Sequence, residues 1–207
     1  MTDPRTELVG AGYDAMIDTW ESWKDQITDD PRAEWCGELL ARLPEGAHVV
    51  ELGCGGGTPE TQRLAERFRL TGVDLSEAQL ARARERVPRA DFIRADFTAL
   101  ELEPGSVHAV AAFYSFNHVP RDLLAPLYER IRSWLVPDGL FLASLGTSDT
   151  DNWTGDFLGA PNYFSSFPPD VNSCMLEEDG FELLRDELVT IKEPEGGATF
   201  QWILARR

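Results

Sequence analysis

A glycine-rich segment directly after an apolar run constrains the fold of this chain more than any other feature. Residues 49–57 read Val-Val-Glu-Leu-Gly-Cys-Gly-Gly-Gly, and residues 58–68 have the character of a helix. Glycine has no Cβ, so Gly53, Gly55 and Gly57 can adopt positive φ and let a ligand approach the backbone closely. This order predicts an α/β fold that binds a ligand at the carboxyl edge of a parallel sheet.

A carboxylate follows at the end of the next apolar run. Asp74 lies in the sequence Val73-Asp74-Leu75, where a second strand should end, about 20 residues after the glycine loop. A carboxylate at this spacing can accept hydrogen bonds from the hydroxyls of a ribose. Asp74 and its neighbour Leu75 are therefore candidate contacts to an adenosine-like ligand.

The loop differs from the common phosphate-binding patterns. The dinucleotide fingerprint places a third glycine where this chain has Thr58, and no Gly-Lys-Ser/Thr sequence follows the loop. Glu51, just before the first glycine, would repel a pyrophosphate but suits an ammonium group. These features disfavour a nucleotide-dependent oxidoreductase, although a plain strand-to-helix turn with a surface Asp gives the same pattern.

An acid, then G-x-G-x-G, then a strand-end acid resembles the class I S-adenosylmethionine-dependent methyltransferases. The resemblance implies S-adenosylmethionine as cofactor, with its amino-acid end at Glu51, Gly53, Cys54 and Gly55 and its ribose at Asp74. It also implies a Rossmann-like seven-stranded sheet with helices on both faces, whose last strand is antiparallel and inserted beside the fifth. The periodicity alone predicts only a doubly wound α/β sheet.

Apolar runs alternate with helical patterns along the whole chain, which predicts one domain over residues 1–207. Two helices are expected in a cap over residues 1–43, with a break at Asp29-Asp30-Pro31, and an irregular insert is expected over residues 146–169. After the glycine loop and its helix, the expected strands cover residues 70–74, 91–95, 107–114, 140–145, 182–191 and 199–205. Further helices are expected from a Ser76–Gln79 capping box, over residues 121–135 up to a Pro137-Asp138-Gly139 turn, and near residues 172–178.

The composition limits the partners and the compartment. The formal net charge of −17 disfavours nucleic-acid substrates, because an acidic surface repels phosphate backbones. No signal sequence and no apolar run of about 18 residues is present, so we expect a cytoplasmic protein without a membrane partner. Three widely spaced cysteines form no metal-ligand motif, and no metal is expected.

The resemblance assigns further contacts to the cofactor. Asp96 and Phe97, after the expected strand 91–95, would hold the adenine through its exocyclic amine and its ring face. Tyr13 and Trp20 would close over the ligand from the N-terminal helices, and Tyr114 would contact its methionine part. The alternatives are a helix cap for Asp96 and core packing for the aromatic rings.

His118 follows the expected strand 107–114, whose carboxyl end should face the ligand cleft. An imidazole can take a proton near neutral pH, so His118 is the candidate catalytic residue, as a general base or as a group that orients the substrate. A hydrogen-bonded structural histidine is the alternative. The neighbouring Asn117 could bind a polar group of the substrate or simply make a turn.

The insert is rich in aromatic residues and carries three prolines. We interpret it as a lid over an apolar or aromatic small molecule, with Trp153, Tyr163 and Phe164 as candidate substrate contacts. The predicted function is transfer of a methyl group to an O, N or S atom of a small molecule, with natural products among the candidates. A non-catalytic domain that binds S-adenosylmethionine or activates a partner is the alternative.

Overall fold

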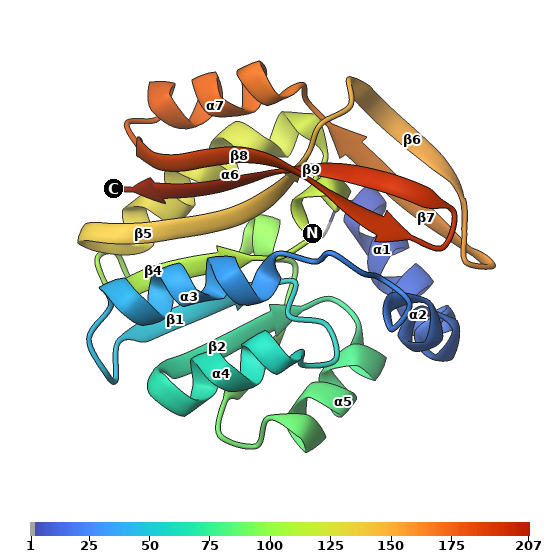
Figure 1. Cartoon of the computed structure of the whole chain (residues 1–207), viewed down its shortest axis with the longest axis horizontal. Helices are drawn as coiled ribbons and strands as arrows, with labels where there is room; N and C mark the ends of the chain where they lie inside the picture. Colours follow the sequence, from blue (N-terminus) through green and yellow to red (C-terminus); the bar gives the residue numbers. More distant parts are fainter. Residues whose placement is uncertain (1–2) are drawn as a thin grey trace.

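The computed structural model describes residues 3–207, which form one seven-stranded sheet between two helical layers and a separate two-stranded hairpin (Figure 1). The helices are α1 (Pro4–Ala15), α2 (Ile17–Lys24), α3 (Arg32–Arg42), α4 (Pro59–Arg67), α5 (Glu77–Arg86), α6 (Arg121–Trp134) and α7 (Pro169–Glu178), with short 3₁₀ turns at η1 (Phe97–Ala99) and η2 (Phe116–His118). The strands are β1 (His48–Leu52), β2 (Arg69–Asp74), β3 (Asp91–Arg94), β4 (Val107–Ala112), β5 (Leu135–Gly146), β6 (Thr150–Phe157), β7 (Ala160–Ser166), β8 (Glu182–Glu193) and β9 (Gly196–Arg206).

The large sheet has the strand order β3-β2-β1-β4-β5-β9-β8. Strands β1 to β5 pair in parallel, and β9 enters antiparallel between β5 and β8, with Phe141 opposite Ala205. The seven strands, the antiparallel last strand and its place beside the fifth parallel strand are confirmed.

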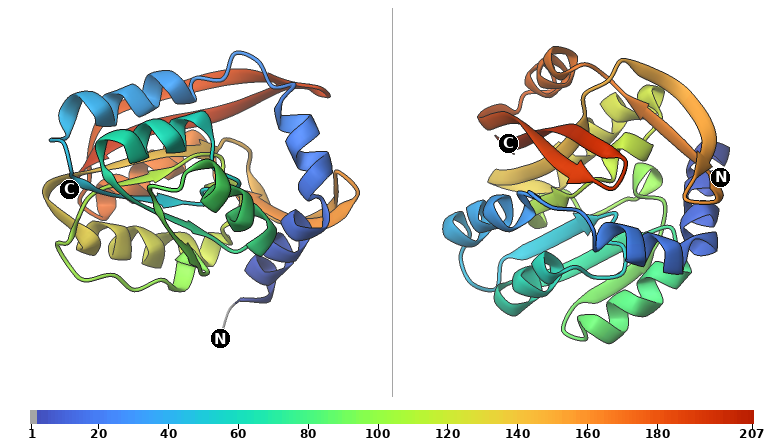
Figure 2. Two further views of the ribbon diagram at one scale, coloured as in Figure 1. Left: turned by 90° about the horizontal axis from the view of Figure 1, so that it is seen from below. Right: turned by 45° about the vertical axis from the view of Figure 1, so that its right-hand side comes forward.

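Side chains from alternate positions of the central strands are buried on opposite faces of the sheet. On β4, Ala109 and Ala111 pack with α3 and α4, whereas Val110 and Ala112 pack with α6. Strands buried on both faces need apolar residues at nearly every position, which explains the unbroken apolar runs in the sequence. Figure 2 shows the helical layers on the two sides of the sheet.

Capping residues mark the first turns of α4 and α5. Thr58 and Thr61 form a reciprocal capping box at α4. Ser76 Oγ accepts a hydrogen bond from the Gln79 amide at α5, as expected, but the Ser76 amide donates to Asp74 Oδ1, 2.9 Å away. The predicted capping box at Ser76 is therefore only half formed, because Asp74 takes the place of the Gln79 side chain.

The N-terminal cap and the segment after α6 differ from expectation. The cap contains three helices instead of two, because the chain turns at Met16 between α1 and α2. The predicted turn at residues 137–139 lies within β5: Asp138 has φ +61°, but Leu135 already pairs with Val107 of β4. Backbone pairing thus extends the strand to both sides of this irregularity.

The insert is regular, contrary to the prediction of an irregular segment. Strands β6 and β7 pair antiparallel, with Thr154 opposite Tyr163. The hairpin lies against α1 at the edge of the sheet where the parallel strands end (Figure 1). This packing needs small residues on α1, because a Cβ on Gly12 would lie 2.6 Å from the carbonyl oxygen of Pro161. The hairpin, α1 and α2 therefore gather beside the glycine loop.

Candidate functional site

The glycine loop joins β1 to α4 in a conformation that requires glycine. Gly53, Gly55 and Gly57 have φ values of +72°, +54° and +73°. A Cβ on Gly53 would lie 2.4 Å from Cβ of Ser115, so only glycine lets these two segments touch. The loop lines a cleft, which we call the loop cleft, together with residues of α1, β2, α5 and η1.

Asp74 connects the end of β2 to this loop. Its two carboxylate oxygens accept hydrogen bonds from the amides of Gly55 and Ser76, both at 2.9 Å. Desolvation raises the pKa of the Asp74 carboxyl above its ordinary value, while these amides lower it. Asp74 and Leu75, the residues predicted to contact a ribose, both line the loop cleft.

Two polar side chains in the loop cleft are buried without all their hydrogen-bond partners. Glu51 is 2% exposed, and its Oε1 accepts a hydrogen bond from Thr61 Oγ1 at 3.1 Å, whereas its Oε2 has no partner. Gln79 Oε1 has no partner either. Burial raises the pKa of the Glu51 carboxyl to about 8. Unpaired buried acceptors are costly, so this site suits a ligand that brings hydrogen-bond donors, and a cation at Glu51.

Asp96 and Phe97 line the same cleft. Asp96 caps η1 by accepting a hydrogen bond from the Thr98 amide at 2.9 Å, and its other oxygen accepts one from Thr6 Oγ1 of α1 at 2.6 Å. The Phe97 ring stacks on Phe116, with centroids 5.9 Å apart. Asp96 thus has the capping role and Phe97 the packing role, and both residues also line the loop cleft.

A second cavity of about 540 Å³ adjoins the loop cleft, and we call it the aromatic cavity. The two share their wall at Tyr13, Trp20, Lys24, Arg32, Tyr114 and His118. Trp20 and Trp23 stack with centroids 5.4 Å apart, and Phe157 of the hairpin packs against both rings. The arrangement provides two compartments that meet at one boundary.

His118 lies at this boundary and is hydrogen-bonded at both ring nitrogens. Its Nδ1 is 2.8 Å from the carbonyl oxygen of Tyr163, which can only accept, so Nδ1 carries the proton. Nε2 therefore accepts from the hydroxyl of Tyr13, 3.0 Å away. Burial lowers the pKa of His118 to about 4, which keeps the imidazole neutral near pH 7.

The candidate substrate contacts of the insert separate into two groups. Phe164 lines the aromatic cavity, and so does Asn117 of η2, whose buried Oδ1 has no partner. Trp153 is 43% exposed and lies outside the residues that line either compartment. The Tyr163 side chain also lies outside them, and its hydroxyl donates to Asn152 Oδ1 at 2.8 Å. The alternation of β7 explains the position of Tyr163, because successive residues point to opposite sides of the hairpin. Trp153 lies opposite Phe164 in the pairing, and its exposed ring packs on the Phe164 ring with centroids 5.5 Å apart.

Sequence reasoning missed several residues that line the two compartments. Gln79 has the signal of a capping box, yet its side-chain oxygen lies in the loop cleft. Lys24 and Arg32 come from the N-terminal helices, whose position over the sheet no local pattern reveals. Phe157 belongs to the aromatic insert and lines the aromatic cavity. The sequence does not reveal how the two strands of the hairpin pair, and this pairing decides which residues face the cavity.

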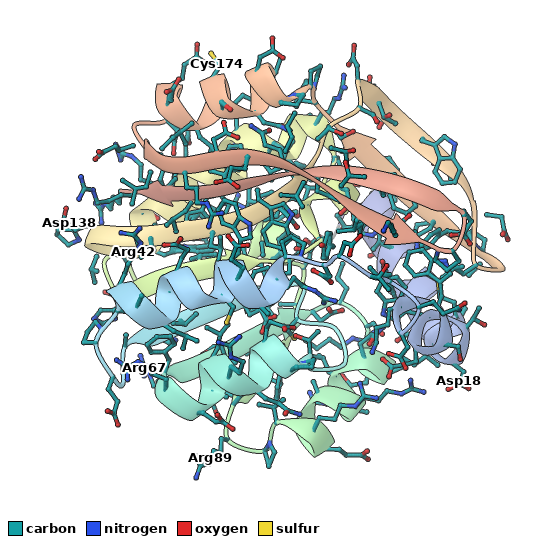
Figure 3. All side chains as sticks on the ribbon, in the orientation of Figure 1. Asp18, Arg42, Arg67, Arg89, Asp138 and Cys174 are labelled. Carbon is teal, nitrogen blue, oxygen red and sulfur yellow. The ribbon has the colours of Figure 1, made fainter. Side chains whose placement is uncertain are left out.

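Two of the three cysteines are buried and the third is exposed. Cys36 and Cys54 are buried, and burial raises the pKa of the Cys54 thiol well above its ordinary value, so it packs in the loop cleft as a neutral group. Cys174 is exposed on α7 (Figure 3).

Within residues 3–207, no three His, Cys, Asp or Glu side chains are grouped to hold a metal ion. The helices described here are also too short or too polar to span a membrane.

The chain is similar to known methyltransferases. The sequence profile of a methyltransferase-domain family matches residues 49–139, which include the glycine loop, Asp74 and His118. A trans-aconitate 2-methyltransferase of Paracidovorax citrulli is 50% identical over 82 residues, which are 37% of this chain and 31% of that protein. A trans-aconitate 2-methyltransferase of Variovorax paradoxus is 40% identical over 131 residues, 60% of this chain and 49% of that protein. The matched part thus spans less than half the length of both relatives.

A solved structure shares the fold over nearly the whole chain. It is the 1,6-didemethyltoxoflavin-N1-methyltransferase of Burkholderia thailandensis, with bound 1,6-didemethyltoxoflavin and S-adenosylhomocysteine. The TM-score is 0.71 at 22% sequence identity, and the similarity covers 95% of this chain and 84% of that chain.

Proposed function

Because this chain belongs to the class I S-adenosylmethionine-dependent methyltransferases, we propose that it binds S-adenosylmethionine in the loop cleft and methylates a small molecule held in the aromatic cavity. The observation that carries the proposal is the shared wall of the two compartments, with His118 and Tyr13 at the boundary. A methyl group has to cross such a boundary in one direct displacement.

The residues of the loop cleft fit this cofactor. The unpaired Oε2 of Glu51 suits the ammonium group of the methionine part, and Gln79 Oε1 offers a further acceptor. The Asp74 carboxylate keeps acceptor capacity for the ribose hydroxyls, because each of its oxygens accepts one amide. Asp96 and Phe97 would bind the adenine. Trp20, Tyr13 and Tyr114 would cover the ligand at the boundary.

When bound, S-adenosylmethionine supplies an electrophilic methyl group on a sulfonium. The protein then has to align an O, N or S nucleophile with it and exclude water. His118 is neutral, and its Nε2 is occupied by the Tyr13 hydroxyl, so we assign it an orienting role that fixes Tyr13 and the hairpin. A proton taken from an acceptor would have to pass through the Tyr13 hydroxyl.

The hairpin β6–β7 serves in this proposal as the cover of the aromatic cavity. The net charge of −17 supports a small-molecule acceptor over a nucleic acid, and a cytoplasmic location is part of the same proposal. The names of the relatives make trans-aconitate the first acceptor to assay, and natural products are further candidates.

The test is release of S-adenosylhomocysteine during incubation with S-adenosylmethionine and a panel of acceptors that includes trans-aconitate. We expect acceptor-dependent release that Asp74→Ala weakens when S-adenosylmethionine is below saturation. Binding of S-adenosylhomocysteine by calorimetry without any turnover across the panel would favour the alternative, a domain that binds the cofactor without catalysis.

A further inference from the structure

The walls of the aromatic cavity indicate which class of acceptor it takes. One group of rings comes from α2 and the hairpin, where Trp23 and Phe157 lie 5.7 Å apart in an edge-to-face contact. A second group comes from β9 and the end of β4, where Tyr114 and Phe200 lie 4.7 Å apart. Aromatic rings lining one cavity favour a flat apolar ligand, because ring stacking adds to the burial of its faces.

The charges that line this cavity are already compensated. Arg32 pairs with Asp30 at 2.7 Å, and Lys24 lies 3.4 Å from Glu21 Oε1. Glu193 adds a negative charge to the wall, and burial together with the charge of Glu195 raises the pKa of its carboxyl. Among the residues that the structure describes, Lys24 and Arg32 are the only Lys or Arg side chains in this lining.

A polycarboxylate is therefore a poor match. Its negative charges would leave water for a cavity whose two cations already have acidic partners, and buried charges without free counter-ions are strongly unfavourable. A neutral or singly charged molecule avoids this cost.

One buried atom indicates how the acceptor is oriented. Asn117 lines the cavity, its buried Oδ1 has no hydrogen-bond partner, and its Cβ lies close to Gly146 at the end of β5. An unpaired buried acceptor gains free energy when a ligand donates to it. Hydroxyls of Ser148 and Thr199 line the same cavity and offer further polar contacts.

We propose that the acceptor is a planar aromatic or heteroaromatic molecule with at most one negative charge, whose N–H or O–H group donates to Asn117 Oδ1. This inference rests on the proposed function, since it assumes that the loop cleft holds the cofactor. It separates this chain from the acceptor that the names of its relatives state, because trans-aconitate carries three carboxylates.

The test uses three probes on protein saturated with S-adenosylhomocysteine: 2-naphthol, 2-naphthoate and trans-aconitate. The first two have the same ring system and differ in charge. Calorimetry should rank 2-naphthol tightest, with trans-aconitate at least about tenfold weaker. Trans-aconitate binding as tightly as 2-naphthol would overturn the inference. Failure of S-adenosylhomocysteine itself to bind would overturn the proposed function instead.

Variants locate the probe in the cavity. Asn117→Ala and Phe200→Ala should each weaken 2-naphthol about 5-fold or more, with S-adenosylhomocysteine affinity and melting temperature near those of the parent. Leu188→Ala is the matched control, because Leu188 is 60% exposed on β8 and lies outside the cavity lining. Unchanged 2-naphthol affinity in both cavity variants would overturn the inference. If Asn117→Ala fails to fold, Asn117→Asp keeps an acceptor oxygen and should retain 2-naphthol but reject 2-naphthoate.

Discussion

The hydroxyl of Tyr13 donates a hydrogen bond to Nε2 of His118 across 3.0 Å, at the boundary between the loop cleft and the aromatic cavity. The other ring nitrogen of His118 donates to the carbonyl oxygen of Tyr163 on the hairpin. One imidazole thus connects α1, η2 and β7. These hydrogen bonds hold α1, which lines the loop cleft, and the hairpin, which lines the aromatic cavity, in a fixed relative position.

This connection predicts how turnover depends on pH. Because burial lowers the pKa of His118 to about 4, the ring is already neutral above about pH 5. At saturating substrates, kcat should show no titration of His118 between about pH 5.5 and 7.5. His118→Asn, which can still hydrogen-bond, should retain more turnover than His118→Ala. The two variants separate the roles, because a general base would instead give a loss of about 10²–10⁴-fold in turnover in both of them.

The raised pKa of the Glu51 carboxyl predicts that cofactor binding releases a proton. Its carboxyl has a pKa of about 8 in the free protein, so it is mostly protonated at pH 7. An ammonium group beside Oε2 favours the carboxylate and lowers this pKa, so affinity should rise from pH 6 towards 8. Calorimetry of S-adenosylhomocysteine at pH 7 in buffers of different ionisation enthalpy should show proton release, and Glu51→Gln should abolish it. Equal proton counts in parent and variant would mean that another group binds the ammonium.

The position of the glycine loop in the cleft predicts that a side chain at Gly55 blocks cofactor binding by occupying space, in addition to straining the backbone. Gly55→Val places a branched side chain at φ +54° inside the loop cleft, so S-adenosylhomocysteine binding should be lost while the fold remains. Gly46→Val is the matched control: Gly46 has φ +75° and open space around its Cβ position, in the turn before β1. The control should lose stability but keep its affinity. Normal binding by Gly55→Val would place the cofactor elsewhere.

The position of the hairpin predicts that substitutions in it weaken acceptor binding and leave cofactor binding unchanged. Phe157→Ala and Phe164→Ala remove rings from the wall of the aromatic cavity, so the KM for the acceptor should rise while affinity for S-adenosylhomocysteine stays near that of the parent. Thr154→Ala changes an exposed residue of the same hairpin that lies outside the lining of both compartments, and it should change neither value appreciably. Steady-state kinetics with the acceptor that supports turnover provides the comparison. If the Phe variants keep the parental KM, the hairpin only supports the fold.

The parts of the site that could be predicted from sequence are those with local signals. The glycine loop and the capping residue Ser76 depend on backbone conformation within a few residues, and both lie where their patterns indicate; Asp74 ends β2 as predicted. The central strands were equally readable, because burial on both faces demands apolar runs.

Features fixed by distant contacts were not readable. The sequence Pro137-Asp138-Gly139 has turn chemistry, and Asp138 does adopt positive φ, but pairing with β4 makes the segment part of a strand. The polar and proline-containing insert forms a hairpin, although its sequence lacks a strand pattern. Its two strands are regular because they pair with each other. Gln79 lines the cleft because Asp74 takes its capping partner.

Calorimetric titration of S-adenosylhomocysteine into the parent protein, Asp74→Ala and Asp91→Ala measures whether the Asp74 carboxylate binds the cofactor in the loop cleft. Asp91 is an exposed carboxylate at the start of β3 and serves as the control for the loss of an acidic side chain. We expect binding at one site in the parent and in Asp91→Ala, and a binding free energy about 1–3 kcal/mol weaker in Asp74→Ala, the scale of a charge-assisted hydrogen bond. Equal affinity in all three proteins, or no binding in the parent, would contradict a cofactor site at Asp74.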